Sequence, residues 1–139
     1  MADIVSAETR SRMMSGIRGT DTRPEMLVRR YLHAAGLRFR LHDRRLPGKP
    51  DLVFPGLRTV VFVHGCFWHR HPGCRFASVP ASRKDFWTGK FEANVIRDAA
   101  KAAALQQQGW KVLTIWECET REPDKLDQLF WRIVAPHDT

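Results

Sequence analysis

Hydrophobic side chains at helical spacing predict an amphipathic helix near each end of the chain. In residues 22–36, TRPEMLVRRYLHAAG, the apolar positions recur as they do in a helix with one buried face. Thr22 and Glu25 match a capping box at its start, and Gly36 matches a helix stop. Residues 122–134, EPDKLDQLFWRIV, show the same spacing. The side chains predicted to face the core are Leu27, Val28, Tyr31, Leu32 and Ala35 in the first helix and Leu126, Leu129, Phe130 and Ile133 in the last.

Shorter apolar runs between these helices predict strands. Residues 37–41, LRFRL, alternate between apolar and basic side chains, which predicts a strand with Leu37, Phe39 and Leu41 facing inward. A turn signal, LPGKP, separates it from two further strands that a hairpin-like loop, PGLR, connects. The other predicted strands are residues 51–54 (DLVF), 59–65 (TVVFVHG) and 111–116 (KVLTIW).

The longest predicted helix follows an irregular segment, residues 65–82, that is rich in Pro, Gly and His. Ser82 and Asp85 suggest its N-terminal cap, and we expect it to end at Gln108, with Gly109 as the stop. The element order is therefore helix, strands, long helix, strand, helix. This order predicts an α/β (α+β) fold with a mixed central β-sheet.

The net charge of the chain indicates a class of binding partner. The chain has 139 residues, which suits one compact domain, and a formal net charge of +8, an excess that attracts polyanions such as nucleic acid. No apolar run is long enough to cross a bilayer, and the first residues, MADIVSAETR, lack the apolar core of a secretory signal. We therefore expect no membrane partner and a cytoplasmic, nucleoid-associated location.

Cysteine and histidine are concentrated in one short segment, VFVHGCFWHRHPGC. It holds Cys66, His71 and Cys74, and the remaining cysteine, Cys118, follows the strand KVLTIW. If that strand runs beside TVVFVHG, all three cysteines meet His71 at one end of the sheet, and Cys₃His is a closed tetrahedral zinc set. The odd cysteine count also argues against a disulfide framework. The sequence predicts a structural zinc ion; the alternative is that Cys118 is a small core residue and the others belong to a polar loop.

A second metal site is suggested by Asp51, which follows Pro50, and by His64, which ends the neighbouring predicted strand. Two adjacent strands would bring both side chains to the same edge of the sheet. A carboxylate oxygen suits Mg²⁺, and a nearby imidazole can accept a proton from a water molecule. On spacing alone, an aspartate that ends the turn PGKP is the simpler interpretation.

Four stretches together closely resemble one family, the very short patch repair (Vsr) endonucleases, over residues 8–134. They are TRSRMMSGIRGTDT, LPGKPDLVF, VFVHGCFWHRH and GWKVLTIWEC. The resemblance implies a restriction-endonuclease-like fold, in which helices flank a mixed sheet. It also implies an enzyme that nicks one strand of duplex DNA 5′ of the thymine in a T:G mismatch, which arises when 5-methylcytosine deaminates. A structural zinc ion and a catalytic Mg²⁺ are features of the family.

The same resemblance implies roles for particular residues. Asp51 would bind Mg²⁺ through its carboxylate, and Val63 would bind it through its backbone carbonyl, for which the side chain is unimportant although threonine is the familiar residue there. His69 would act as the general base or position the attacking water, and His64 would contact the waters around the metal. His64 stands where the wider nuclease superfamily carries lysine. Glu25 and Asp98 match acidic positions of the family and would support this site.

Aromatic residues in the same region have a possible role in opening the DNA. Phe67, Trp68 and Trp87 are candidates for a wedge between stacked bases, which a mismatched step resists less than a paired one. The alternative is that these rings belong to the core, because a buried tryptophan is more common than an intercalating one. The remaining tryptophans, Trp110, Trp116 and Trp131, are expected to be core or packing residues.

The N-terminal segment is polar and basic and lacks a clean apolar stripe. We expect residues 1–20 to form a DNA-binding arm and residues 21–139 to form a single nuclease domain. The resemblance places Met14 on the opposite side of the DNA from the aromatic wedge. The arginines expected to hold phosphates are Arg10, Arg12, Arg18 and Arg23.

Three hypotheses follow for the activity. The first is a monomeric, Mg²⁺-dependent enzyme that nicks T:G mispairs, linked to a cytosine-5 methyltransferase and to mismatch-repair proteins. The second is a restriction-type enzyme of the same fold that cuts both strands of matched DNA. The third is a non-catalytic zinc DNA-binding module, for which Asp51, His64 and His69 would have no evident use.

Overall fold

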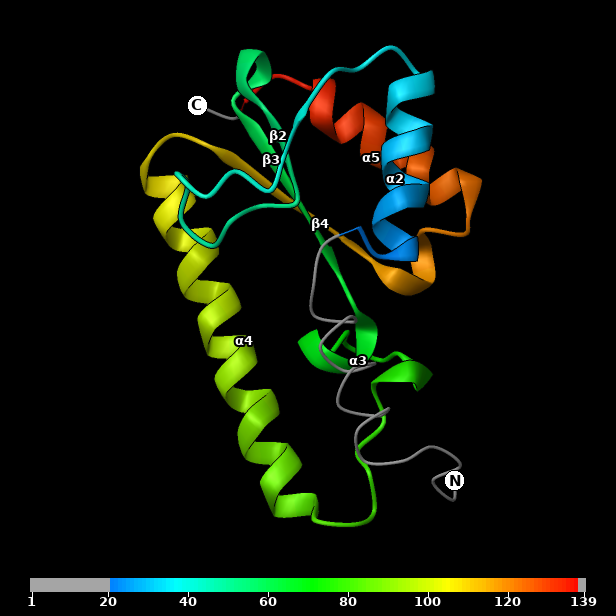
Figure 1. Cartoon of the computed structure of the whole chain (residues 1–139), viewed down its shortest axis with the longest axis vertical. Helices are drawn as coiled ribbons and strands as arrows, with labels where there is room; N and C mark the ends of the chain where they lie inside the picture. The colour runs from blue at the N-terminus through cyan, green and yellow to red at the C-terminus, as the bar shows by residue number, and fades with distance from the viewer. Residues whose placement is uncertain (1–20, 138–139) are drawn as a thin grey trace.

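A four-stranded mixed sheet with strand order β1-β2-β3-β4 forms the centre of the structure (Figure 1). The structure is a computed structural model that describes residues 21–137. The strands are β1 (Arg40–Leu41), β2 (Leu52–Phe54), β3 (Thr59–His64) and β4 (Lys111–Trp116). The first three pair antiparallel, and β4 lies parallel to β3. A 3₁₀ turn, η1 (Pro55–Leu57), joins β2 to β3, so the predicted hairpin and the mixed sheet are both confirmed.

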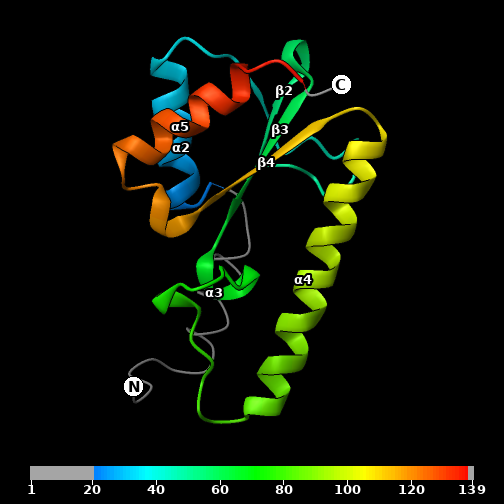
Figure 2. The same ribbon diagram turned by 180° about the vertical axis from the view of Figure 1, so that it is seen from behind.

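Helices cover both faces of this sheet. They are α2 (Arg23–Ala34), α4 (Lys84–Gln107) and α5 (Pro123–Val134). Two views from opposite sides show α2 and α5 packed side by side on one face and α4 on the other (Figures 1 and 2). Side chains alternate across β3: Val61 joins the core beneath α2 and α5, whereas Val60 and Phe62 join Leu105 of α4. The sheet is therefore a central layer, as predicted.

The parallel pair β3 and β4 determines where the chemistry-bearing residues lie. His64 is opposite Trp116 in the register, so both strands end at the same edge. Beyond them the chain forms α3 (Cys66–His69) and η3 (Glu117–Glu119). The segment predicted to be irregular also contains a second short turn, η2 (Arg75–Ala77). The expected meeting of the two strand ends is confirmed.

The first predicted strand is mostly irregular. Only Arg40–Leu41 pairs with β2, and Leu41 is 41% exposed rather than inward, on a two-residue strand at the edge of the sheet. Leu37 and Phe39 do pack against the core and are partly buried. Ala35, predicted to face the core, is exposed because it lies beyond the last turn of α2.

The predicted capping and stop signals of α2 are confirmed only in part. Thr22 Oγ1 accepts a hydrogen bond from the Glu25 N–H at 3.3 Å, and Gly36 adopts the left-handed conformation (φ 98°) that stops the helix. The Glu25 side chain does not complete the capping box, because Arg29 and His42 bind it instead.

The start of α4 also differs from the prediction. The helix begins at Lys84 after a left-handed Arg83 (φ 56°), and no side chain caps it, so the predicted cap at Ser82 is wrong. Asp85 lies in the first turn, where its negative charge interacts favourably with the helix dipole.

Trp131 on α5 is predicted to be a core or packing residue, but it is 62% exposed because it lies on the outer side of this helix. None of the helices within residues 21–137 is long and apolar enough to cross a membrane.

Candidate active site and metal centre

Three thiols and one imidazole converge beyond the ends of β3 and β4. The ligand atoms of Cys66, His71, Cys74 and Cys118 all lie within 4.8 Å of one another. His71 Nδ1 is 3.7 Å from Cys66 Sγ and 3.4 Å from Cys118 Sγ. In a tetrahedral zinc site, normal bond lengths place a sulfur and a nitrogen ligand about 3.6 Å apart. The donor set and its spacing therefore fit zinc.

The electrostatics of this cluster also fit a cation. All three cysteines are free, and Cys66 is completely buried. Burial raises the pKa of the Cys66 thiol to about 12, and it also raises the pKa of the Cys118 thiol. Buried thiols at such a position ionise only when a positive charge compensates them, which a zinc ion does. The His71 ring is stacked on Trp116 with centroids 4.4 Å apart, which fixes the imidazole.

Arg70 holds the loop that carries His71 and Cys74 of the Cys₃His cluster. It takes a left-handed conformation (φ 58°) at the end of α3, and its guanidinium donates to the carbonyls of Phe67 (3.0 Å) and Ser78 (3.2 Å) and to that of Ala77. The same group lies 3.9 Å from the centre of the Phe91 ring on α4. One side chain thus ties the loop to itself and to the long helix. The sequence analysis did not identify this residue.

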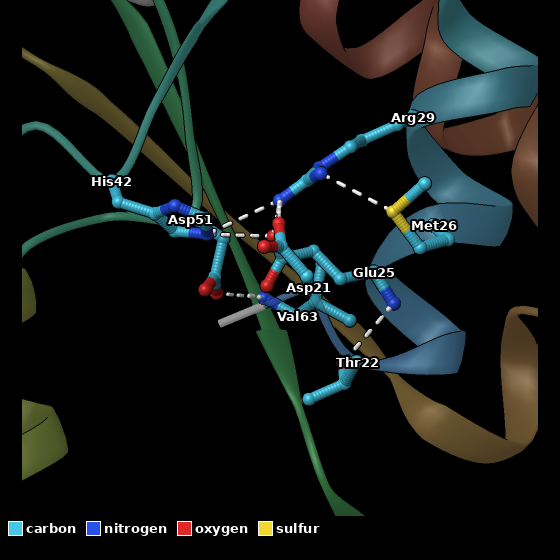
Figure 3. A network of polar contacts seen from close by, with 8 residues as sticks. All are labelled: Asp21, Thr22, Glu25, Met26, Arg29, His42, Asp51 and Val63. Atoms are coloured by element: carbon cyan, nitrogen blue, oxygen red, sulfur yellow. Dashed lines mark hydrogen bonds and ion pairs between the residues drawn. The ribbon is translucent and has the colours of Figure 1, made fainter. Parts of the chain in front are cut away.

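Asp51 lies at the edge of the sheet immediately before β2. Its Oδ2 accepts a hydrogen bond from the Val63 N–H of β3 at 2.7 Å (Figure 3). Burial, and then the negative charge of the adjacent Glu25 carboxylate, raise the pKa of Asp51 to about 6, although the Val63 N–H opposes the shift. Two neighbouring acidic groups in a partly buried site are stabilised by a cation, and oxygen ligands suit Mg²⁺. Asp51 and Glu25 therefore offer oxygen ligands that suit a magnesium ion, although His64, which the sequence suggested as its neighbour, lies elsewhere.

Glu25 is the most buried acidic residue described, at 2% exposure. His42 Nε2 lies 2.6 Å from its Oε2, and Arg29 contacts the same oxygen (Figure 3). Because a carboxylate can only accept, the His42 proton at this contact is on Nε2. The sequence analysis did not identify Arg29 or His42. The spacing of Glu25 and Arg29, one helical turn apart, was the available signal for the first of them.

A third group, on the α4 face, consists of His64, His69 and Asp98. The two imidazoles are stacked with centroids 3.9 Å apart and an interplanar angle of 6°. His69 Nδ1 lies 2.6 Å from Asp98 Oδ2, so Nδ1 carries a proton, and in the neutral ring the lone pair is on Nε2. Burial and the neighbouring His69 charge lower the pKa of His64 to about 4, so His64 is neutral at pH 7. Burial alone would raise the pKa of Asp98, but the hydrogen bond and charge of His69 hold it below its ordinary value.

The predicted aromatic residues form one cluster between α3 and α4. Phe67 contacts Trp68 edge to face at 4.9 Å, and Trp87 lies 6.0 Å from Phe67 and 5.7 Å from Trp68. All three are partly buried, whereas Phe91 beneath them is 4% exposed. Asn94 of α4 donates a hydrogen bond to the Trp68 carbonyl at 3.2 Å. The rings are thus neither core residues nor free side chains: they rest on a buried ring and leave one side accessible.

Not every predicted residue joins these groups. Within residues 21–137, no cluster of three or more metal-binding side chains contains both Asp51 and His64. Strand alternation explains this separation, because Val63 and His64 point to opposite faces of β3. Arg23 is exposed at the first turn of α2. Four predicted residues, Arg10, Arg12, Met14 and Arg18, lie outside the described part of the chain.

Comparison with known proteins agrees with this arrangement. The family model "DNA mismatch endonuclease Vsr" matches residues 2–75. The type II nicking enzyme V.XorIIP of Xanthomonas oryzae pv. oryzae is 49% identical over 98% of this chain and 99% of its own length. The DNA mismatch endonuclease Vsr of Escherichia coli K12 is 45% identical over 91% of this chain and 80% of its own. The type II nicking enzyme V.NmeAIP of Neisseria meningitidis serogroup A is 43% identical over 87% and 86%. The mixed sheet between helices is the restriction-endonuclease-like fold expected for such proteins, and the chain belongs to the DNA mismatch endonuclease Vsr family.

Proposed function

We propose that this protein, a DNA endonuclease by its family, nicks one strand of duplex DNA on the 5′ side of the thymine in a T:G mispair and requires Mg²⁺ to do so. The observation that carries the proposal is the position of two groups on either side of the end of β3. Asp51 is bound to the Val63 N–H on one side, and the His69–Asp98 pair lies with His64 on the other. The names of the related proteins, mismatch endonuclease and nicking enzyme, support the substrate and the single-strand cut.

The metal would be held by the Asp51 carboxylate and the backbone carbonyl of Val63. When bound there, Mg²⁺ supplies charge stabilisation to the phosphate oxygens and lowers the pKa of an attacking water. Glu25 lies next to Asp51 and would hydrogen-bond water around the ion. The Val63 N–H fixes one Asp51 oxygen, so the other oxygen is the one oriented for binding.

His69 would take the proton from the attacking water. Its Nδ1–H is committed to Asp98, which leaves the Nε2 lone pair free and keeps the ring orientation fixed. Stacking on His64 restricts the ring further, and a neutral His64 avoids repulsion when His69 becomes positively charged. The Asp98 carboxylate would stabilise that charge, as an acidic partner does for other catalytic histidines.

Recognition of the mispair would come from the aromatic cluster and the N-terminal segment. Phe67, Trp68 and Trp87 would enter the stack at the mismatched step, where opening the duplex costs least. The zinc ion would hold α3 and the loop that follows it. Residues 1–20 would act as a basic arm on the phosphates, with residues 21–139 as the nuclease domain.

The test is a strand-cleavage assay on a labelled duplex with one central T:G pair, presented in a panel of flanking sequences. We expect a single nick 5′ of the thymine with Mg²⁺ and none with EDTA. Asp51→Asn should remove the activity, whereas Asp124→Asn, an exposed aspartate on α5, should not. Cleavage of both strands of fully matched DNA would instead identify a restriction-type enzyme. Nicking by Asp51→Asn at the normal rate would reject the proposed metal site.

A further inference from the structure

The side chain of Arg29 lies where three potential metal ligands converge. Its Nη2 is 2.6 Å from Asp21 Oδ1 and 3.3 Å from His42 Nε2, and it contacts Glu25 Oε2. Ligand atoms of Asp21, Glu25 and His42 all lie within 4.8 Å of one another. Two carboxylates and an imidazole form a donor set typical of divalent metal sites. A positively charged nitrogen of the protein itself is therefore at the centre of such a set (Figure 3).

This arginine is held from several directions. It is one helical turn from Glu25 on α2, its side chain is 13% exposed, and its Nη1 points at Met26 Sδ at 3.2 Å. Its Nε is buried without a hydrogen-bond partner among the described residues. A buried guanidinium is stable only when carboxylates compensate its charge, so Arg29 and the buried Glu25 depend on each other.

The arrangement bears directly on Asp51. Beyond the effect of burial, the Glu25 carboxylate is near enough to Asp51 that its negative charge raises the pKa of Asp51, so the two groups repel when both are ionised. Arg29 and His42 bind Glu25 through its Oε2, where Arg29 supplies a compensating positive charge. Glu25 is thereby fixed beside Asp51 while its own charge is balanced.

We propose that Arg29 is a positioning residue that serves as a resident cation: it fixes Glu25 beside Asp51 and excludes a divalent ion from the set formed by Asp21, Glu25 and His42. A divalent ion bound at Asp51 would then not be joined by another ion in this three-ligand set. The role of that ion in catalysis rests on the proposed function, whereas the occupation of the three-ligand set by Arg29 does not.

The proposal predicts that a neutral residue at position 29 creates a second divalent site. The probe is Mn²⁺, whose free concentration is measured by electron paramagnetic resonance in a titration of the zinc-loaded full chain. Asp51→Asn is present in every sample, so the proposed catalytic ion does not contribute. In this background, Arg29→Met should gain one Mn²⁺ per chain, bound at least tenfold more tightly than any Mn²⁺ in the parent. Arg29→Lys should behave like the parent, because it restores the positive charge.

The ligands are tested by a further substitution. Adding Glu25→Gln to Arg29→Met should abolish the gained Mn²⁺, because it removes the carboxylate shared by the set. A folded Arg29→Met protein that binds no additional Mn²⁺ overturns the proposal, as does a gained site that persists after Glu25→Gln. If Arg29→Met is unfolded without metal, Mn²⁺ should restore the fold in proportion to its concentration, because it would bind only the native state. A protein that stays unfolded in excess Mn²⁺ also overturns the proposal. None of these readouts needs DNA cleavage, so they are independent of whether Asp51→Asn abolishes nicking.

Discussion

His69 Nδ1 lies 2.6 Å from Asp98 Oδ2, so an aspartate on the long helix α4 orients an imidazole presented by the short helix α3. The contact joins two segments 29 residues apart in sequence. A carboxylate in this position fixes both the direction of the ring and the nitrogen that carries the proton.

Replacement of Asp98 by asparagine should therefore lower the rate of the chemical step rather than the affinity for DNA. The amide keeps the size of the side chain, but it neither stabilises a charged His69 nor enforces the same tautomer. We expect the single-turnover nicking rate to fall by about 100-fold, the size of a typical general-base contribution. Glu92→Gln, an exposed acidic residue on the same helix, is the matched control and should leave the rate unchanged. An Asp98→Asn enzyme with the normal rate would show that His69 does not act as the base.

Loss of one thiol from the Cys₃His cluster should remove zinc and destabilise the whole domain. Cys118→Ala leaves three ligands and opens a closed tetrahedral site, and structural zinc contributes directly to folding. We expect the zinc content, measured by mass spectrometry, to fall from one ion per chain to well below one. The free energy of unfolding should decrease by several kcal/mol. His33→Ala, which removes an exposed histidine on α2, should retain both the metal and the stability.

The zinc cluster could be predicted from the sequence because its geometry follows from strand pairing. Cys66 and Cys118 each follow their strand by two residues, so a parallel pair of strands brings them together once the register is right. The register places His64 opposite Trp116, which is the alignment that the two apolar runs suggest. Local pattern and tertiary contact agree here.

The network around Glu25 could not be predicted in the same way. His42 reaches it from a left-handed position (φ 47°) directly after the two-residue edge strand, and nothing in the alternation of residues 37–41 indicates that turn. Asp98 was found only through the family resemblance, because spacing along a 24-residue helix does not indicate which turn faces His69. Side-chain contacts between distant elements depend on packing angles that the sequence pattern does not contain.

Arg70 should contribute measurably to stability although it binds no metal. It donates hydrogen bonds to the backbone carbonyls of Phe67, Ala77 and Ser78, around the Cys₃His cluster, and lies over the Phe91 ring. Arg70→Ala should lower the free energy of unfolding of the zinc-loaded protein by about 1 to 3 kcal/mol in urea titrations. Arg70→Lys should recover only part of this loss, because one ammonium group cannot reproduce the planar fork of a guanidinium.

The matched control for this measurement is Arg38→Ala. Arg38 also donates to two backbone carbonyls, those of His33 and Leu37, but on an exposed part of the surface. We expect its loss to change the free energy of unfolding by less than about 0.5 kcal/mol. Equal effects of the two substitutions would mean that neither the contact with the Phe91 ring nor the position of Arg70 beside the Cys₃His cluster increases its contribution to the free energy of unfolding.

The aromatic cluster should decide between a T:G mispair and a matched pair. Phe67 and Trp68 rest on the buried Phe91 and retain an accessible side, so they can be inserted without exposing the core. Phe67→Ala or Trp68→Ala should weaken binding to T:G duplex by about 1 to 3 kcal/mol, the value of stacking one base on a ring, and change binding to matched duplex much less. Fluorescence of 2-aminopurine beside the mispair reports base unstacking directly and should rise on binding of the parent protein but not of these variants. Trp131→Ala removes an equally large but exposed ring from α5 and should leave the signal intact. Variants at Phe67 and Trp68 that still unstack the reporter base would assign the opening of the duplex to another part of the protein.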